Sequence, residues 1–137
     1  MPTNTEIVQG IFAAFQRGDV AAILNVFDDN VEGIEPGAPA IPWAGPRKGK
    51  NGAAEFFRIM GDTTEVLKFE PRKYVASGDT VIALGSWEIR GKSTGKVARS
   101  DWALDFTIRN NKVIRWQGYL DTAAEQVVFA AAAKASM

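Results

Sequence analysis

The first third of the chain has apolar residues at helical spacing. They recur every three or four positions over residues 7–15, after Thr3 and Glu6, which are separated as in a capping box. Gly18 predicts the end of this helix, and Asp19 stands where it can cap a second, short helix. We therefore predict two helices that form an antiparallel hairpin.

Residues 28–30 are polar and predict a turn, and residues 31–35 indicate a short strand. A segment rich in proline and glycine then extends to Gly49. Its composition would suit a linker between domains, but only about 35 residues precede it, too few for a stable core. We therefore expect an ordered loop over the mouth of a pocket, followed by a third helix at roughly 51–61.

From Val66 onward the pattern changes to the alternation of strands. The sequence predicts four of them, over residues 66–75, 80–89, 97–108 and 112–120. Pro71 indicates an edge strand or a bulge, because proline cannot donate to a sheet ladder. Asn110 and Asn111 suit a tight hairpin with positive backbone angles.

The chain ends in a further predicted helix. Thr122 and Glu125 have capping-box spacing before a helix that runs toward the carboxyl end, and the preceding Asp121 is expected to cap its amino end. Helices followed by a meander of long strands predict one α+β domain over residues 1–137. Alternation within the strands implies one sheet face packed on helices and one facing solvent or a partner subunit.

Composition removes several classes of function. Lys plus Arg and Asp plus Glu number 16 each, so the formal net charge is zero and no global field attracts nucleic acid or an anionic membrane. The chain has no cysteine and no histidine, which excludes disulfides, thiol nucleophiles, serine–histidine triads and histidine zinc sites. We expect no metal and no cofactor. With neither a signal peptide nor a membrane-spanning stretch in the sequence, we expect a cytoplasmic protein.

Several motifs together resemble the SnoaL-like and ketosteroid-isomerase-like group of the nuclear transport factor 2-like superfamily. They are Gly18–Val20, Phe27–Asp29, Glu35–Gly37, Gly49, Phe56–Phe57, Trp102, Phe106, Asn110–Val113 and Tyr119–Thr122. The resemblance implies a cone-shaped, curved antiparallel sheet wrapped by the N-terminal helices around an apolar pocket, with a C-terminal helix. It also implies a homodimer joined through the outer sheet face.

Glu35, followed by Pro36, lies where ketosteroid isomerases carry their aspartate base and where limonene-type epoxide hydrolases carry a water-holding asparagine. The resemblance therefore implies that Glu35 points into the pocket. The isomerase's oxyanion tyrosine falls at Ile11, and its second oxyanion acid falls near Leu104. The positions that match the arginine and two aspartates of the epoxide hydrolases carry Gly85, Trp87 and Gly118. Because these defining positions differ, neither activity is expected to transfer by name.

The pocket wall is predicted from strand alternation. Trp87, Trp102 and Trp116 fall on strand positions that face the pocket, and Trp43 lies in the covering loop. The predicted lining is Ile11, Phe15, Trp43, Trp87, Trp102, Leu104, Trp116 and Leu120. These aromatic residues either stack against a flat hydrophobic ligand or fill a core.

Two charged groups are interpreted as surface features. Arg99, Asp101 and Asp105 occupy strand positions on the face opposite Trp102, which indicates a solvated or dimer-interface face. The basic residues around Arg47 are best interpreted as part of a solvated loop.

Glu35 is the candidate catalytic residue. A carboxyl in an apolar cavity has a raised pKa and can act as a general base near neutral pH. The alternative is a glutamate exposed beside the loop or bonded to free backbone N–H groups. The sequence thus predicts either a cofactor-independent isomerase-, cyclase- or hydrolase-type enzyme acting on a hydrophobic carbonyl-bearing substrate, or a non-catalytic binding protein for a hydrophobic metabolite. An interaction or dimerisation module is the third possibility.

Overall fold

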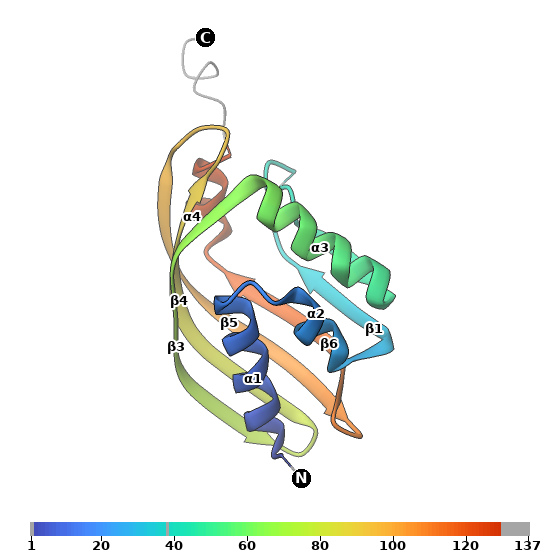
Figure 1. The fold of residues 1–137 in the computed structure, drawn as a ribbon. Helices are drawn as coiled ribbons and strands as arrows, with labels where there is room; N and C mark the ends of the chain where they lie inside the picture. The colour runs from blue at the N-terminus through green and yellow to red at the C-terminus, as the bar shows by residue number, and fades with distance from the viewer. Residues whose placement is uncertain (1, 38, 130–137) are drawn as a thin grey trace.

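The computed structural model describes residues 2–37 and 39–129 (Figure 1). Two helices open the chain and a third follows the first two strands. The elements are α1 (Asn4–Gln16), α2 (Val20–Asn25), β1 (Phe27–Glu35), β2 (Gly45–Lys48), α3 (Gly49–Thr63), β3 (Thr64–Ser77), β4 (Thr80–Gly91), β5 (Val97–Arg109), β6 (Lys112–Leu120) and α4 (Thr122–Val127). The predicted α+β class is confirmed.

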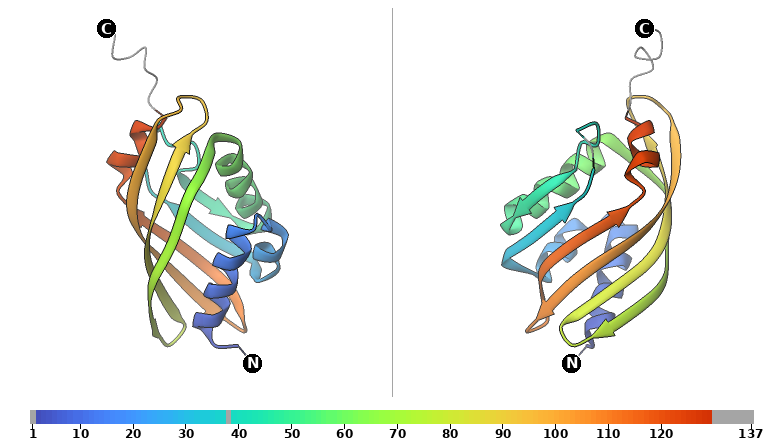
Figure 2. Two further views of the ribbon diagram at one scale, coloured as in Figure 1. Left: turned by 60° about the vertical axis from the view of Figure 1, so that its left-hand side comes forward. Right: turned by 180° about the vertical axis from the view of Figure 1, so that it is seen from behind.

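Six strands form one curved sheet in the order β2-β1-β6-β5-β4-β3. Four neighbouring pairs are antiparallel, whereas β1 and β6 run parallel, so the sheet is mostly antiparallel rather than wholly so. Helices α1, α2 and α3 cover the concave face, and α4 lies at one end of the sheet (Figures 1 and 2). This arrangement is the cone expected from the resemblance.

Local signals in the sequence account for most element boundaries. Thr3 and Glu6 form the predicted capping box, with the Glu6 amide donating to Thr3 Oγ1 at 3.1 Å and the Thr3 amide donating to Glu6 Oε1 at 2.8 Å. Asp19 caps α2 by accepting from the Ala22 amide at 3.0 Å. The hairpin between β5 and β6 places Asn110 and its neighbour at φ 52° and 62°, as predicted.

Two segments differ from the prediction, and a third agrees with it. The polar residues 28–30 are not a turn but part of β1, where the pairing with β6 shifts register between Phe27 and Glu32. The predicted loop contains β2, which pairs with β1 through Glu32 and Lys48. Pro71 lies on the edge strand β3 beside a register shift, so both features predicted for it are present.

The predicted capping box at the last helix is wrong. Asp121 alone caps α4, accepting from the Ala124 amide at 3.1 Å, as expected for that residue. The Glu125 side chain turns instead into the interior, where it is fully buried. The predicted continuation of this helix past residue 129 lies outside the described residues.

The two sheet faces differ as alternation predicted. Trp102 is buried on the concave side, while Arg99 and Asp101 are exposed on the outer side and pair with Glu70 and Arg72. The homodimer through this outer face stays a prediction. No helix in the described part of the chain is both long and apolar enough to cross a membrane.

Candidate functional site

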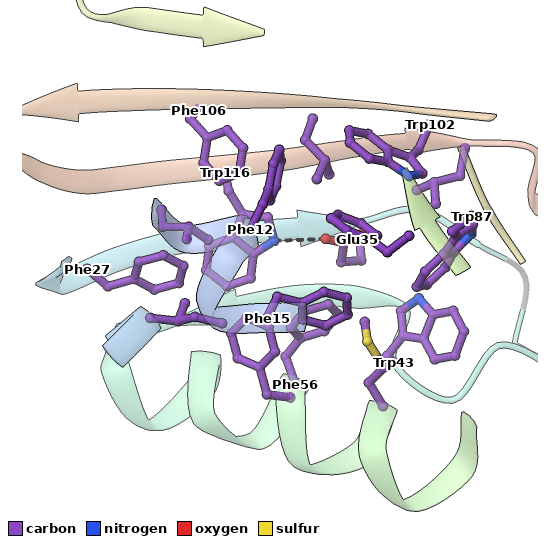
Figure 3. A pocket seen from close by; sticks show the side chains of 17 residues that line it. Phe12, Phe15, Phe27, Glu35, Trp43, Phe56, Trp87, Trp102, Phe106 and Trp116 are labelled. Atoms are coloured by element: carbon purple, nitrogen blue, oxygen red, sulfur yellow. Dashed lines mark hydrogen bonds between the residues drawn. The ribbon is translucent and has the colours of Figure 1, made fainter. Parts of the chain in front are cut away.

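A cavity of about 90 Å³ lies between the concave face of the sheet and the helices (Figure 3). Glu35 and all eight residues predicted as lining surround it. Sequence reasoning missed the following further lining residues: Phe12, Ile23, Phe27, Phe56, Phe57, Met60, Phe69 and Phe106. Most lie on the apolar sides of predicted helices, a signal that locates them in a core but does not show that the core is hollow.

Glu35 ends β1 and is only 6% exposed. Its side chain points to the concave face because it lies two and four residues after the buried Gly33 and Val31, on the same face of the strand. The Trp116 indole N–H donates to Glu35 Oε2 at 2.8 Å (Figure 3). The carboxyl is therefore held from one side by an indole, and it is not exposed beside the loop.

Two glycines make room for this pair. Gly33 is the register partner of Trp116, and a Cβ at Gly33 would collide with the indole ring. A Cβ at Gly118 would collide with Glu35 Oε1. Close approach, rather than an unusual backbone angle, therefore explains why both positions carry glycine.

Burial raises the pKa of Glu35 to about 7. The hydrogen bond from Trp116 opposes this rise, and the charge of Glu125 adds to it. Both protonation states of Glu35 are consequently populated near neutral pH. The raised pKa expected for a carboxyl in an apolar pocket is present.

Glu125 is a second buried carboxyl that the sequence did not single out. The Trp87 indole N–H donates to Glu125 Oε2 at 2.9 Å, and burial raises the pKa of Glu125 to about 7. The hydrogen bond lowers this pKa, and the charge of Asp121 raises it. Glu125 on α4 stands three residues before Val128, the C-cap of that helix, and both are fully buried. This helical spacing was the available signal, but the capping pattern explained the residue another way.

Comparison with known proteins identifies the fold family. The sequence matches the family model for the SnoaL-like domain over residues 8–116, most of the chain. The protein belongs to the SnoaL-like family. A search of curated proteins found no significant match.

Solved structures agree with this assignment. An NTF2-like protein from Burkholderia xenovorans is 33% identical, with 93% of this chain and 95% of that chain covered at a TM-score of 0.84. TerC, co-crystallised with polyporic acid, is 25% identical, with 92% and 97% covered at a TM-score of 0.79. A protein from Mesorhizobium loti assigned as a SnoaL-like polyketide cyclase shares the fold at 20% identity, with 86% and 99% covered at a TM-score of 0.71.

The rest of this SnoaL-like cavity is apolar. Among the 17 described residues that line it, Glu35 is the single charged one. Ile11 and Leu104, which the resemblance matched to the oxyanion groups of ketosteroid isomerases, both lie in the wall. In the described part of the chain, no three acidic residues are grouped so that they could hold a metal ion.

The basic residues of the loop lie outside this cavity. Arg47 pairs with Glu55 at 3.0 Å, Lys48 pairs with Glu32 at 3.9 Å, and Lys50 pairs with Asp29 at 3.5 Å. These ion pairs attach the loop and the start of α3 to their surroundings. They do not form a site for an anionic ligand.

Proposed function

We propose that this SnoaL-like protein is a cofactor-independent enzyme of the isomerase, cyclase or hydrolase type, with Glu35 as general base. One observation carries the proposal: a carboxyl with a pKa of about 7 lies in the wall of an otherwise apolar cavity. At neutral pH a large fraction of Glu35 is ionised and able to accept a proton. Among the described residues no group donates a hydrogen bond to its Oε1, which leaves that oxygen for a substrate.

The chemistry that suits this arrangement is removal of a proton from carbon next to a carbonyl group. The carboxylate oxygen takes the proton and the electron pair of the C–H bond moves into the carbonyl, which gives an enolate. Return of the proton to another carbon gives an isomer, and attack of the enolate carbon on a second carbonyl closes a ring. The apolar wall supports a hydrophobic substrate.

The size of the cavity limits what enters without rearrangement. Its volume of about 90 Å³ is below the 300–1,000 Å³ of usual ligand pockets. Five lining residues are only half-buried, and we expect the cavity to enlarge through movement of their side chains: Phe15, Phe57, Phe69, Leu104 and Leu120. The complex of the related TerC with polyporic acid supports a small-molecule ligand in this fold.

A non-catalytic binding protein is the second candidate. It is favoured by the apolar character of the wall and by Ile11 and Leu104 at the positions where the isomerases carry oxyanion groups. Such groups normally supply a large part of the rate. This alternative predicts that the carboxyl of Glu35 contributes nothing to proton transfer from bound compounds.

Base-catalysed ring opening of benzisoxazole tests Glu35 without knowledge of the natural substrate. In this reaction a base takes the C–H proton, the C–H electron pair forms the nitrile, and the N–O bond breaks to leave a phenolate that absorbs light. We expect turnover that rises with pH through about 7, because the ionised form of Glu35 is the base. Glu35→Gln should lower the rate roughly 10²- to 10⁴-fold.

Glu32→Gln is the matched control. Glu32 lies on the same strand with its side chain 58% exposed, so the substitution removes one carboxylate from the surface and should leave turnover unchanged. Equal rates for wild type and Glu35→Gln would overturn the proposed base and favour the binding protein.

A further inference from the structure

Two buried polar atoms, one in the cavity wall and one on a carboxyl bonded to the wall residue Trp87, have no partner among the described residues. They are Trp102 Nε1 and Glu125 Oε1. Trp102 is 4% exposed and Glu125 is fully buried, so neither atom is compensated by bulk water. Leaving a buried donor or acceptor unpaired costs about 1–3 kcal/mol for each group. Such atoms call for an explanation, and a bound group that pairs with them is one.

The fold brings these two side chains to the same region. The Trp102 indole lies over Gly85 of the neighbouring strand, where a Cβ would come within 2.6 Å of the ring, and it stacks on Phe69 at 5.1 Å. Trp87 follows Gly85 by two residues on the same face, and its indole N–H holds Glu125. Figure 3 shows Trp87 and Trp102 together at the end of the cavity away from Trp116.

The two atoms have complementary hydrogen-bonding capacity. An indole N–H donates and never accepts, whereas an ionised carboxylate accepts and never donates. Because Oε2 of Glu125 is occupied by Trp87, Oε1 is the acceptor that remains. A hydroxyl group that reaches both atoms would satisfy both, since its oxygen would accept from Trp102 while its hydrogen would be donated to Glu125.

We propose that Trp102 and Glu125 form a subsite for the hydroxyl group of a ring-shaped apolar ligand, separate from Glu35. The subsite rests on the proposed function only in requiring that the cavity binds a small molecule. Leu120, the half-buried register partner of Trp102, is the neighbour that turns to admit the oxygen. The ligand class is therefore phenols and related cyclic alcohols, with Glu35 left free to act at another position of the ligand.

Phenol and toluene are matched probes for this subsite, because they share one ring and differ by a hydroxyl in place of a methyl group. We expect wild type at pH 8, above the pKa of about 7 of Glu125, to prefer phenol. Trp102→Phe and Glu125→Gln should each lower the ratio of phenol to toluene affinity about tenfold, the effect of one lost hydrogen bond. Toluene affinity reports whether each variant keeps its cavity, and Glu32→Gln should keep the wild-type ratio.

The indole N–H signals in the NMR spectrum of wild type give a second measurement, independent of whether a variant folds. Saturation with phenol should move the Trp102 N–H signal downfield, and saturation with toluene should not. An unchanged affinity ratio in Trp102→Phe, an unmoved Trp102 signal, or no binding of phenol by wild type would each overturn the subsite.

The benzisoxazole assay separates this inference from the proposed base. If the subsite is wrong but the base is right, Glu35→Gln still abolishes turnover while Trp102→Phe leaves the phenol preference intact. If the base is wrong but the subsite is right, the phenol preference depends on Trp102 and Glu125 while turnover is the same in wild type and Glu35→Gln.

Discussion

The interior contains two pairs of the same chemistry in different settings. Trp116 donates to Glu35 at 2.8 Å and Trp87 donates to Glu125 at 2.9 Å, and burial raises both carboxyl pKa values to about 7. Glu35 comes from β1, the strand next to the edge strand β2, and lines the cavity. Glu125 comes from α4, a helix of six residues, and is not among the cavity-lining residues.

The difference shows that a raised pKa alone does not distinguish a reactive carboxyl from a binding or structural one. Burial is the largest cause of the shift in both residues. The setting separates them, because Glu35 lines the cavity itself, whereas Glu125 is bonded to the lining residue Trp87 and has only Oε1 unpaired among the described residues. The two proposals above therefore give proton transfer to the first pair and hydrogen bonding to the second.

The largest expected effect is on stability as a function of pH. Each carboxyl has its pKa raised from the ordinary 4.5 to about 7, so between these values the folded state holds a proton that the unfolded state has lost. Stability must therefore fall as pH rises through this window, by about 3 kcal/mol for each carboxyl at about 1.4 kcal/mol per pKa unit. Urea unfolding at several pH values measures the fall.

Glu35→Gln and Glu125→Gln should each remove about half of this pH dependence, because glutamine does not titrate. If one variant removed the whole pH dependence of stability, the pKa of the other carboxyl would not be raised, and the two pairs would not be equivalent. Stability that rises with pH from 5 to 8 in wild type would contradict the sign of both shifts.

The second prediction concerns the glycine beneath the first pair. Gly33→Ala places a methyl group where the Trp116 ring lies, so the indole must move and its hydrogen bond to Glu35 must break. We expect a loss of about 3 kcal/mol in the free energy of unfolding, as for an overpacked core. Gly10→Ala is the control, since nothing lies within 4 Å of its added methyl group on α1, and it should stabilise by about 0.5–1 kcal/mol. Equal effects of the two substitutions would contradict the close packing.

The third prediction removes the donor of the first pair alone. Trp116→Phe keeps an aromatic ring but loses the N–H, and a hydrogen bond to a charged group contributes roughly 1.5–3 kcal/mol. Because this bond lowers the pKa of Glu35, its loss should raise that pKa above about 7 while leaving the pKa of Glu125 near its present value. NMR titration of ¹³C-labelled glutamate carboxyls measures both. A lowered pKa of Glu35 would contradict the conclusion that the Trp116 N–H stabilises its ionised form.

Much of the fold could be predicted because its signals are local. The capping box at Thr3, the turn at Asn110 and the alternation along β5 each depend on residues close together in the sequence. The parallel pairing of β1 with β6 could not be predicted, since it joins segments about 80 residues apart and no local pattern specifies it. β2 was assigned to a loop for a local reason, because its four residues begin with Gly45 and Pro46, two residue types that are depleted in strands.

The site was predicted through the resemblance rather than through the residues alone. The position of Glu35 came from its match to a family motif, and alternation oriented the tryptophans. Gly33 and Gly118 gave no signal of their own, because a glycine reveals what it accommodates only when the opposite strand is placed. Glu125 was assigned to a capping box because two residues three positions apart in a helix can either form such a box or lie on one face. In the structure Asp121 caps the helix by accepting from the Ala124 amide, and the Glu125 side chain points inward instead.

The smallest predicted effect tests the capping of α4 by Asp121, because this helix contains Glu125 of the second pair. Asp121→Ala removes the acceptor of the Ala124 amide and should destabilise the protein by about 1 kcal/mol. It should also shift the Trp87 indole N–H signal, since Glu125 lies in the first turn of α4, while the Trp116 signal stays in place. Asp19→Ala removes the equivalent cap of α2 at a similar cost and should leave both signals unchanged.

Asp121→Asn separates the cap from the charge at this position, because asparagine caps a helix as well as aspartate but carries no charge. Asp121→Asn should therefore be as stable as wild type, unlike Asp121→Ala. It should lower the pKa of Glu125, since the charge of Asp121 raises that pKa. If Asp121→Ala shifted the signals of both indoles equally, the two pairs would respond as one unit. The assignment of separate roles to Glu35 and Glu125 would then lose its structural basis.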